Sequence, residues 1–360
     1  MAKNSSLNAA KDAKNDEFYT RYEDIQAELN HYEEHFKNKT VLCNCDDPFE
    51  SNFCKFFLKN FNYLGLKRLI CTSYTSSPVV GTQMTIFDYL DEPVKKGHGY
   101  VMDISEVPMA NGRGVSDDDI EKLLTSKKRG VKKLEGEGDF RSAECVEYLK
   151  QADIVVTNPP FSLFRDYINS LMEYDKKFLI IGNQNALHYK EIFPLIQNDK
   201  FWIGYNHVKE FLKPDGTTQK FGNVLWYTNL DITKRHEELI MYRKYNEDEY
   251  IKYINYDAID VGKVAEIPMD YYGNMGVPDS FLEKYNPDQF EIIGLAESER
   301  GKSIGMSANL SDDEKDALFK ENKSFRAGNP IYRDQNGKLH KPFSRIIIRR
   351  KESNNEDWII

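Results

Sequence analysis

Several features that would place this 360-residue sequence in a common class of protein are missing. No apolar run approaches the roughly 18 residues of a membrane-spanning helix. No apolar segment follows Met1, so no secretory signal peptide is expected. Cysteine is scarce, and the five present include no Cys-x-x-Cys pair. We therefore expect reduced thiols in the core of a cytoplasmic protein, and neither zinc ligands nor disulfides.

Positive charge is in deficit over the whole chain, with 49 Lys and Arg against 58 Asp and Glu and a net charge of −9. This balance by itself argues against a nucleic-acid-binding protein. Basic residues are nevertheless concentrated at residues 127–133 and 331–351, and local patches of this kind can contact phosphate groups. A solvated charged face is the alternative. The basic residues that we expect to contact phosphates are Lys127, Lys128, Arg129, Lys341, Arg345 and Arg349.

Short apolar, β-branched segments alternate with helical patterns through about the first two-thirds of the chain. Such alternation predicts an α/β fold with a doubly wound, mostly parallel sheet. From about residue 256 the sequence becomes turn-rich and polar, and residues 1–15 are polar enough to predict a flexible N-terminus. The predicted strands are residues 40–45, 67–72, 154–157, 178–182, 201–204, 223–228, 250–255, 290–295 and 345–350.

The stretch Ile154-Val155-Val156-Thr157-Asn158-Pro159-Pro160-Phe161 is a short buried strand that runs into a double proline. The prolines end the strand, fix φ and lack an N–H, so the backbone there is stiff. A primary amide, a rigid carbonyl and an aromatic ring therefore lie together at the carboxyl end of a strand. In open α/β sheets ligands bind at this end.

This group of side chains suits methylation of an exocyclic amine. The Asn158 side-chain oxygen and the Pro159 carbonyl can each accept one N–H of an adenine amino group, which orients the amine as positive charge develops on it. Phe161 can stack on a base taken out of a duplex. The residues predicted to be catalytic are Asn158, Pro159, Pro160 and Phe161. The alternative is a strand-ending turn followed by a core phenylalanine.

Polar residues after the first strand predict a site for a nucleotide-like cofactor. The acidic turn and the helix N-terminus that follows it can hold polar groups, and the lack of Gly-x-Gly there argues against a dinucleotide site. Further along, Asp139 is expected to accept from the amino group of a bound adenine ring, with Phe140 beside it. Helix capping is the alternative for these acids. The residues predicted to bind the cofactor by this reasoning are Asp46, Asp47, Asp139 and Phe140.

Residues 74–135 lack strong periodicity and hold several glycines and the first basic run. A segment of this length inside a compact domain is usually functional or partly disordered. We interpret it as a long insertion and, as a hypothesis, as a lid that clamps DNA; one further strand is expected within it at residues 99–104.

The Asn158-Pro159-Pro160-Phe161 motif resembles that of S-adenosylmethionine-dependent adenine-specific methyltransferases. Three further segments narrow the resemblance, over roughly residues 16–295, to the EcoRI-type adenine DNA methyltransferases. They are Asp16-Glu17-Phe18-Tyr19-Thr20, Cys43-Asn44-Cys45-Asp46-Asp47-Pro48 with Ser51-Asn52-Phe53, and Gly276-Val277-Pro278 with Phe281-Leu282 and Lys284-Tyr285-Asn286-Pro287.

The resemblance implies a Rossmann-like class I methyltransferase fold, with the cofactor-binding and catalytic domain at residues 16–255 and a target-recognition region at 256–360. It also implies S-adenosylmethionine as cofactor, without a metal, and places Phe18, Tyr19 and Thr20 against its methionine end. By the same resemblance, further cofactor-binding residues are Asn44, Pro48, Ser51, Asn52 and Phe53. The chain departs from the family pattern twice. The glycines that usually follow Asp-Pro are missing, and no acid ends the second strand at Cys71-Thr72-Ser73-Tyr74, so the partner of the ribose hydroxyls is unassigned.

The implied activity is methyl transfer to the N6 amino group of a flipped adenine in double-stranded DNA. Asn185 and the basic residues named above would then contact DNA. Such a protein, expected as a monomer, would act beside a separate restriction endonuclease or as an orphan or phage-encoded modifier. The alternatives are an enzyme of the same fold acting on RNA adenine or protein glutamine, and a non-catalytic DNA-binding relative.

Overall fold

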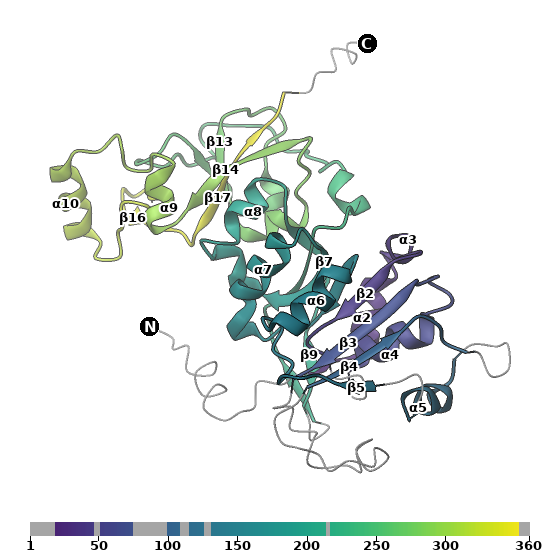
Figure 1. The fold of residues 1–360 in the computed structure, drawn as a ribbon. Coiled ribbons are helices and arrows are strands. Elements are labelled where there is room, and N and C mark those ends of the chain that lie inside the picture. Colours follow the sequence, from purple (N-terminus) through teal and green to yellow (C-terminus); the bar gives the residue numbers. More distant parts are fainter. Residues whose placement is uncertain are drawn as a thin grey trace, which may run out of the picture. The chain divides into compact units, whose positions relative to one another are not determined.

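The computed structural model describes residues 19–46, 51–74, 99–108, 115–125, 131–213 and 217–352 (Figure 1). The chain forms two compact units: unit 1 holds Met1–Ile192 and Phe201–Leu230, and unit 2 holds Phe193–Lys200 and Asp231–Ile360. The predicted flexible segment 1–15, Phe18, Asp47, Pro48, Lys127, Lys128 and Arg129 lie outside the described residues. Within the described ranges, no helix is both long and apolar enough to cross a membrane.

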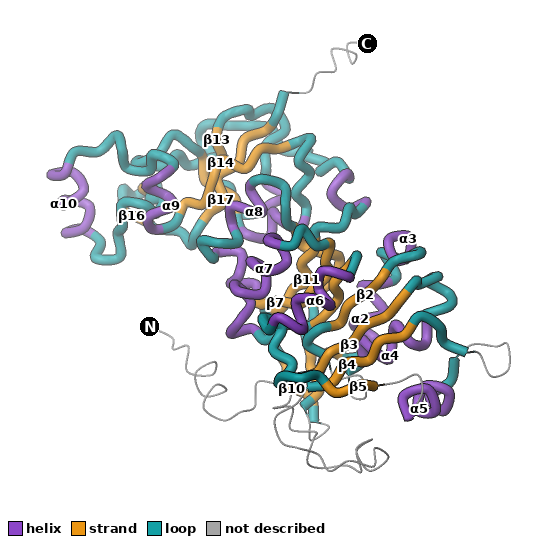
Figure 2. The backbone as a smooth tube through the Cα atoms, viewed as in Figure 1, coloured by secondary structure: helices purple, strands orange, loops and turns teal. Residues whose placement is uncertain are grey.

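Unit 1 is built on an eight-stranded sheet in the order β5-β4-β3-β2-β6-β7-β11-β8 (strands orange in Figure 2). Its four central strands, β3, β2, β6 and β7, are parallel, and the outer pairs are antiparallel. This centre confirms the predicted mixed α/β fold. The strands are β2 (Thr40–Cys43), β3 (Arg68–Ser73), β4 (Tyr100–Ile104), β5 (Val131–Lys133), β6 (Ile154–Thr157), β7 (Lys177–Asn183), β8 (Trp202–His207) and β11 (Val224–Thr228).

Helices cover both faces of this sheet. Phe53 of α4 packs edge-on against Trp226 at 5.8 Å between ring centroids, whereas Phe164 of α7 packs on Tyr227 at 5.6 Å. Since neighbouring residues of a strand point to opposite faces, α4 and α7 lie on opposite sides of β11. The helices of unit 1 are α2 (Tyr22–Leu29), α3 (Glu33–Phe36), α4 (Asn52–Asn60), α5 (Asp117–Thr125), α6 (Ala143–Gln151) and α7 (Phe164–Glu173), with 3-10 helices η3 (Phe161–Leu163) and η4 (Gln184–His188).

The predicted insertion at residues 74–135 contributes to the sheet in its described parts. β4 confirms the strand expected at residues 99–104, and β4 and β5 extend the sheet beyond β3 as antiparallel strands. The ion pair between Arg68 and Asp103, at 2.6 Å, joins β3 to β4. The role of the insertion as a DNA lid stays a prediction.

A three-stranded sheet, β1-β9-β10, pairs the start of the described chain with a much later segment. β1 (Tyr19–Thr20) pairs antiparallel with β9 (Glu210–Leu212), which also pairs with β10 (Thr218–Lys220). Thr20 lies opposite Phe211 in this register. Residues almost two hundred positions apart are thereby held side by side.

Buried Glu28 joins α2 to the edge strand β8. One carboxylate oxygen accepts from the Tyr205 N–H at 2.8 Å and the Tyr32 hydroxyl at 2.9 Å. The other accepts from the main-chain and side-chain N–H groups of Asn206, at 2.7 and 2.9 Å. Burial raises the pKa of Glu28, although these hydrogen bonds lower it. Glu28 thus satisfies two main-chain N–H groups at the edge of the sheet.

Unit 2 contains a four-stranded sheet in the order β12-β13-β17-β14 and a two-stranded sheet, β15-β16. The strands predicted at residues 290–295 and 345–350 are confirmed as β14 and β17. The strands of unit 2 are β12 (Ile259–Asp260), β13 (Asn274–Val277), β14 (Phe290–Ala296), β15 (Tyr332–Arg333), β16 (Leu339–His340) and β17 (Arg345–Arg350). Its helices are α8 (Phe193–Gln197), α9 (Ser298–Ser303), α10 (Asp312–Glu321), η5 (Thr233–His236), η6 (Val264–Glu266) and η7 (Asp279–Glu283).

The strand predicted at residues 250–255 is wrong. This segment makes a single β-bridge, between Lys252 and Ile259. The buried Asn255 side chain takes the place of a ladder: its amide donates to Ser307 at 2.8 Å and its oxygen accepts from the Ile331 N–H at 3.1 Å. An apolar, aromatic pattern cannot show that a side chain will satisfy the backbone.

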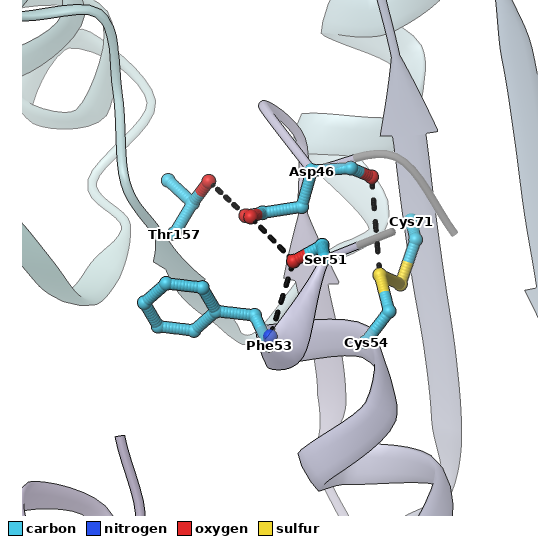
Figure 3. The surroundings of a disulfide bond; sticks show 6 residues. All are labelled: Asp46, Ser51, Phe53, Cys54, Cys71 and Thr157. Carbon is cyan, nitrogen blue, oxygen red and sulfur yellow. Dashed lines mark hydrogen bonds between the residues drawn. A yellow bond between two sulfur atoms is a disulfide. The ribbon is translucent and has the colours of Figure 1, made fainter. Parts of the chain in front are cut away.

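The expectation that all five cysteines are reduced is wrong for one pair. Cys54 of α4 and Cys71 of β3 form a disulfide, with their Cα atoms 6.6 Å apart (Figure 3). Cys43, Cys45 and Cys145 are free. No spacing pattern predicts this disulfide, because it joins a helix to a strand. Burial raises the pKa of the Cys43 and Cys45 thiols well above their usual value.

Candidate active site

The predicted site residues meet where the parallel strands β2 and β6 end. The two strands are neighbours, with Leu42 opposite Val155. From β2 the chain crosses through α4 to β3, on one side, and from β6 it crosses through α7 to β7, on the other. Ligands bind at the carboxyl ends of strands where the connections diverge in this way. Both the turn after β2 and the Asn-Pro-Pro-Phe motif lie at this point.

Asp46 joins the two segments (Figure 3). Its carboxylate accepts from the Ser51 hydroxyl at 2.6 Å and, through its other oxygen, from the Thr157 hydroxyl. Ser51 also caps α4, since its hydroxyl oxygen accepts from the Phe53 N–H at 3.1 Å. Asp46 and Ser51 are both buried. Thr157 immediately precedes Asn158, so the acidic turn is tied directly to the motif.

Asn44 makes a second connection between the same segments. Its side-chain oxygen accepts from the hydroxyl of Tyr167, a fully buried residue of α7. Burial raises the pKa of Tyr167 well above its usual value, so the phenol remains a donor. The Phe140 ring packs edge-on against Tyr167 at 5.0 Å between centroids. Predicted cofactor residues from two separate stretches thus converge on one tyrosine.

Thr20 lies beside the start of α4, and its contact with the cofactor stays a prediction. The Asn52 side-chain amide donates to the Thr20 carbonyl at 2.8 Å, which joins β1 to the first turn of α4. The Thr20 hydroxyl is buried and has no hydrogen-bond partner among the residues that the structure describes. A buried hydroxyl in this state is suited to a ligand that can donate or accept a hydrogen bond.

The motif is only partly exposed, and the side-chain oxygen of Asn158 is buried. Pro159 is buried, whereas Asn158 and Phe161 are half-buried and Pro160 is exposed. Phe161 begins the 3-10 helix η3 and lies edge-on to Phe211 of β9, with ring centroids 6.3 Å apart. Part of the Phe161 ring is therefore accessible to a ligand.

Asp139 lies beside the end of β3 but is engaged by a neighbour. Its carboxylate makes an ion pair with Arg141 at 2.7 Å, and this hydrogen-bonded guanidinium lowers the pKa of Asp139. Gly138 has a φ of +84°, and a Cβ there would lie 2.0 Å from the Ser73 carbonyl oxygen. The glycine is what allows the turn to approach β3. Contact between Asp139 and an adenine ring stays a prediction.

Sequence reasoning missed three residues of this site. In the sequence, Thr157 marks only the end of a strand and Tyr167 only the buried face of a helix, yet each donates to the turn after β2. Glu137 lies next to the end of β3, where its carboxylate accepts from the Tyr74 hydroxyl at 3.3 Å. It is an acid near the position at which none was found in the sequence. The alternation of glycines around it, Gly136-Glu137-Gly138, was the available signal.

The predicted DNA contacts have different surroundings. Asn185 is exposed just beyond β7, and Lys341 is exposed in unit 2. Arg345 is mostly buried in an ion pair with Asp260 at 3.0 Å. Arg349 is half exposed and pairs with Glu291 at 2.8 Å. The positive charge of the segment is therefore partly compensated within unit 2, and all four contacts stay predictions.

Comparison with known proteins identifies relatives of this chain. The model of the family described as "Adenine-specific methyltransferase EcoRI" matches residues 6–351. The type II methyltransferase M.EcoRI of Escherichia coli is 44% identical over 326 residues, covering 85% of this chain and 94% of that protein. The type II methyltransferase M.MpnI of Mycoplasma pneumoniae is 39% identical over 308 residues, covering 80% and 84%.

A third relative covers nearly the whole chain. The type II methyltransferase M.MgeORF184P of Mycoplasma genitalium is 34% identical over 369 residues, covering 96% of this chain and 99% of that protein. No solved structure gives a significant match.

Proposed function

The chain belongs to the EcoRI-type adenine-specific methyltransferase family, and from this premise we propose that it methylates the N6 amino group of an adenine flipped out of duplex DNA, with S-adenosylmethionine as the donor. The protein is a DNA adenine methyltransferase of the restriction–modification type. The observation that carries the finer proposal is the junction of Asp46 with Thr157. It brings the polar turn after β2 next to the Asn158-Pro159-Pro160-Phe161 motif, at the edge of the sheet where ligands bind.

The residues around β2 fit S-adenosylmethionine. The buried Thr20 hydroxyl, which lacks a partner among the described residues, suits the charged methionine end of this molecule. The half-buried Asp139 and the Glu137 carboxylate lie at the end of β3, on the side expected for the adenosine. When bound, the cofactor supplies a methyl group on a positively charged sulfur, which a primary amine can attack without a covalent enzyme intermediate or a metal.

The motif residues supply orientation and charge stabilisation. The Asn158 side-chain oxygen and the Pro159 carbonyl accept the two N–H groups of the target adenine, so that its nitrogen faces the methyl group. These oxygens also stabilise the positive charge that develops on the nitrogen. Phe161 stacks on the extruded base and replaces part of the stacking lost from the duplex. The buried ring of Pro159 and the strand behind it keep this geometry rigid.

Site selection and biological setting complete the proposal. We assign recognition of the target sequence to residues 256–360, with the DNA contacts named above, and a monomer in the cytoplasm, where the DNA substrate is. A separate restriction endonuclease of the same specificity would be the partner in the cell. A GAATTC-like palindrome is expected as the site by resemblance to the family.

The test is methyl transfer from labelled S-adenosylmethionine to unmethylated duplex DNA, followed by sequencing that maps modified adenines. Label at adenine within one short motif is expected. RNA and a protein extract serve as competing substrates, and the Asn158→Ala variant, purified in the same way, controls for contaminating enzymes. Label in RNA or protein but not in DNA would overturn the assignment of substrate. Binding of the cofactor without any transfer would favour a non-catalytic relative.

A further inference from the structure

The turn after β2 holds the catalytic motif at both of its ends, and we propose that Asp46 and Asn44 are positioning residues for methyl transfer. They fix the Asn158–Phe161 segment relative to the cofactor site and do not themselves contact the reacting atoms. The inference rests on the proposed function, since it assigns a role within the same reaction.

Main-chain hydrogen bonds between β2 and β6 do not extend as far as the catalytic motif. The ladder between β2 and β6 pairs Val41 with Ile154 and Leu42 with Val155, and it ends there. On the other side of β6, the ladder with β7 continues as far as Thr157. The bond from the Thr157 hydroxyl to Asp46 therefore extends the contact between β2 and β6 beyond the last paired residues, up to the position before Asn158.

A second bond holds the segment after the motif. Tyr167 lies in the first turns of α7, the helix that follows η3, and its hydroxyl donates to Asn44. The motif is thus bracketed by Thr157 before it and Tyr167 after it, and both donate to residues only two positions apart on one turn. Any shift of this turn moves the two ends of the motif together.

The same turn is also fixed to the cofactor side. Asp46 accepts from Ser51, which caps α4, and the next residue, Asn52, donates to the carbonyl of Thr20. Both buried carboxylate oxygens of Asp46 are therefore engaged, one toward the residues proposed to hold the cofactor and one toward the residues proposed to hold the adenine (Figure 3). Because one buried carboxyl group holds both segments through its two oxygens, the connection is stiff.

The test compares two pairs of matched variants. Thr157→Val and Tyr167→Phe each remove one donor to the turn. Thr228→Val removes an equally buried threonine hydroxyl, which donates to the Phe178 carbonyl at 2.6 Å. Tyr32→Phe removes an equally buried phenol, which donates to Glu28. The two controls lie outside the site and should cost at least as much thermal stability, since the Thr228 hydroxyl also accepts from the Leu230 N–H at 3.0 Å.

Single-turnover rates are measured at saturating S-adenosylmethionine and DNA, with equilibrium binding of the cofactor in parallel. We expect Thr157→Val and Tyr167→Phe to slow methyl transfer by about 10- to 100-fold, since a misplacement of ~1 Å can cost about 100-fold. The controls should stay within about twofold of the unmodified protein, and cofactor affinity should change little in all four. Thr157→Ser keeps the hydroxyl and should restore most of the rate. A rate for Thr157→Val no lower than that of Thr228→Val, or no restoration by serine, would overturn the proposal.

Hydrogen exchange separates this inference from the proposed function. The Leu163 N–H donates to the Pro160 carbonyl, and its exchange reports how firmly η3 is held. Thr157→Val should speed exchange at residues 161–163 by about fivefold, as expected for one lost hydrogen bond, whereas Thr228→Val should leave it unchanged. If the unmodified protein methylates no DNA, the proposed function fails on its own. Unchanged exchange in Thr157→Val would overturn the positioning role in either case.

Discussion

Replacement of Glu28 by glutamine should destabilise unit 1 by about 1–3 kcal/mol, the cost of one buried donor left without an acceptor. The two Glu28 oxygens accept four bonds, two on each side. If the glutamine NH2 group replaces the oxygen that binds Tyr205 and Tyr32, it faces the Tyr205 N–H and the Tyr32 hydroxyl. Of these two groups, only the hydroxyl can rotate to accept a hydrogen bond from it. If the NH2 group replaces the other oxygen, it faces the main-chain and side-chain N–H groups of Asn206. Of these, only the side-chain amide can flip to present its oxygen as an acceptor. Either orientation leaves one main-chain N–H of β8 without an acceptor.

The raised pKa of Glu28 also predicts how the stability difference between Glu28→Gln and the unmodified protein changes with pH. Because burial raises the pKa of Glu28 in the folded state above its ordinary value of 4.5, the stability that the residue contributes is full below that value. It declines as the pH rises through the folded-state pKa. Glutamine does not titrate, so the deficit of Glu28→Gln should be largest in mild acid and should narrow toward neutral pH.

The assay is urea-induced unfolding followed by tryptophan fluorescence at two pH values, combined with hydrogen exchange of the Tyr205 and Asn206 amides. Tyr32→Phe is the matched control, since it removes one of the four hydrogen bonds and leaves no donor without an acceptor. It should lower the free energy of unfolding by no more than about 1 kcal/mol. The reasoning would be refuted if Glu28→Gln kept the unfolding midpoint of the unmodified protein in mild acid and left both amides equally protected.

Three further predictions concern the site and unit 2. Asn158→Ala should lower the single-turnover rate by about 100- to 1,000-fold, as for loss of one preorganised charge-stabilising group, and leave equilibrium binding of the cofactor within about twofold; equal loss of both would show that its role is misplaced. Phe161→Ala should reduce the fluorescence rise of 2-aminopurine at the target adenine, and an unchanged rise would contradict stacking on the flipped base. Gly328→Ala should lower the melting temperature of unit 2 strongly, because its Cβ would lie 1.5 Å from the Ser298 carbonyl oxygen. Gly305→Ala, at a φ of +92° in open space, should cost only about 1–2 kcal/mol, and equal losses would argue against the close approach at Gly328.

The central sheet and the position of the motif could be predicted because their signals are local. The β-branched run before Asn158 ends at a double proline, which fixes both a strand and its boundary. The parallel order of β2 and β6 then brings two turns to one edge of the sheet. Polar residues directly after such strands needed no long-range information to be identified as a site.

The missed features depend on contacts between distant segments. Nothing around Thr157 or Tyr167 in the sequence shows that both donate to the turn after β2. The Cys54–Cys71 disulfide likewise forms across a helix and a strand. The compact units divide at residue 230, while the predicted boundary between catalytic and recognition roles, at residue 255, stays a prediction because compactness alone does not assign a role.

The order of the two units along the chain limits how the protein can be cut. Residues 193–200 belong to unit 2 although unit 1 resumes at residue 201. Within unit 2, Gln197 donates to the Ile293 carbonyl at 2.9 Å, and Asp199 pairs with Arg235 at 2.6 Å. A fragment ending at residue 230 would therefore carry α8 without β14 and expose Phe193 and Ile196, which are buried in the intact protein. Exchanging unit 2 between relatives requires two grafts, and a single crossover would give a chimaera prone to aggregate.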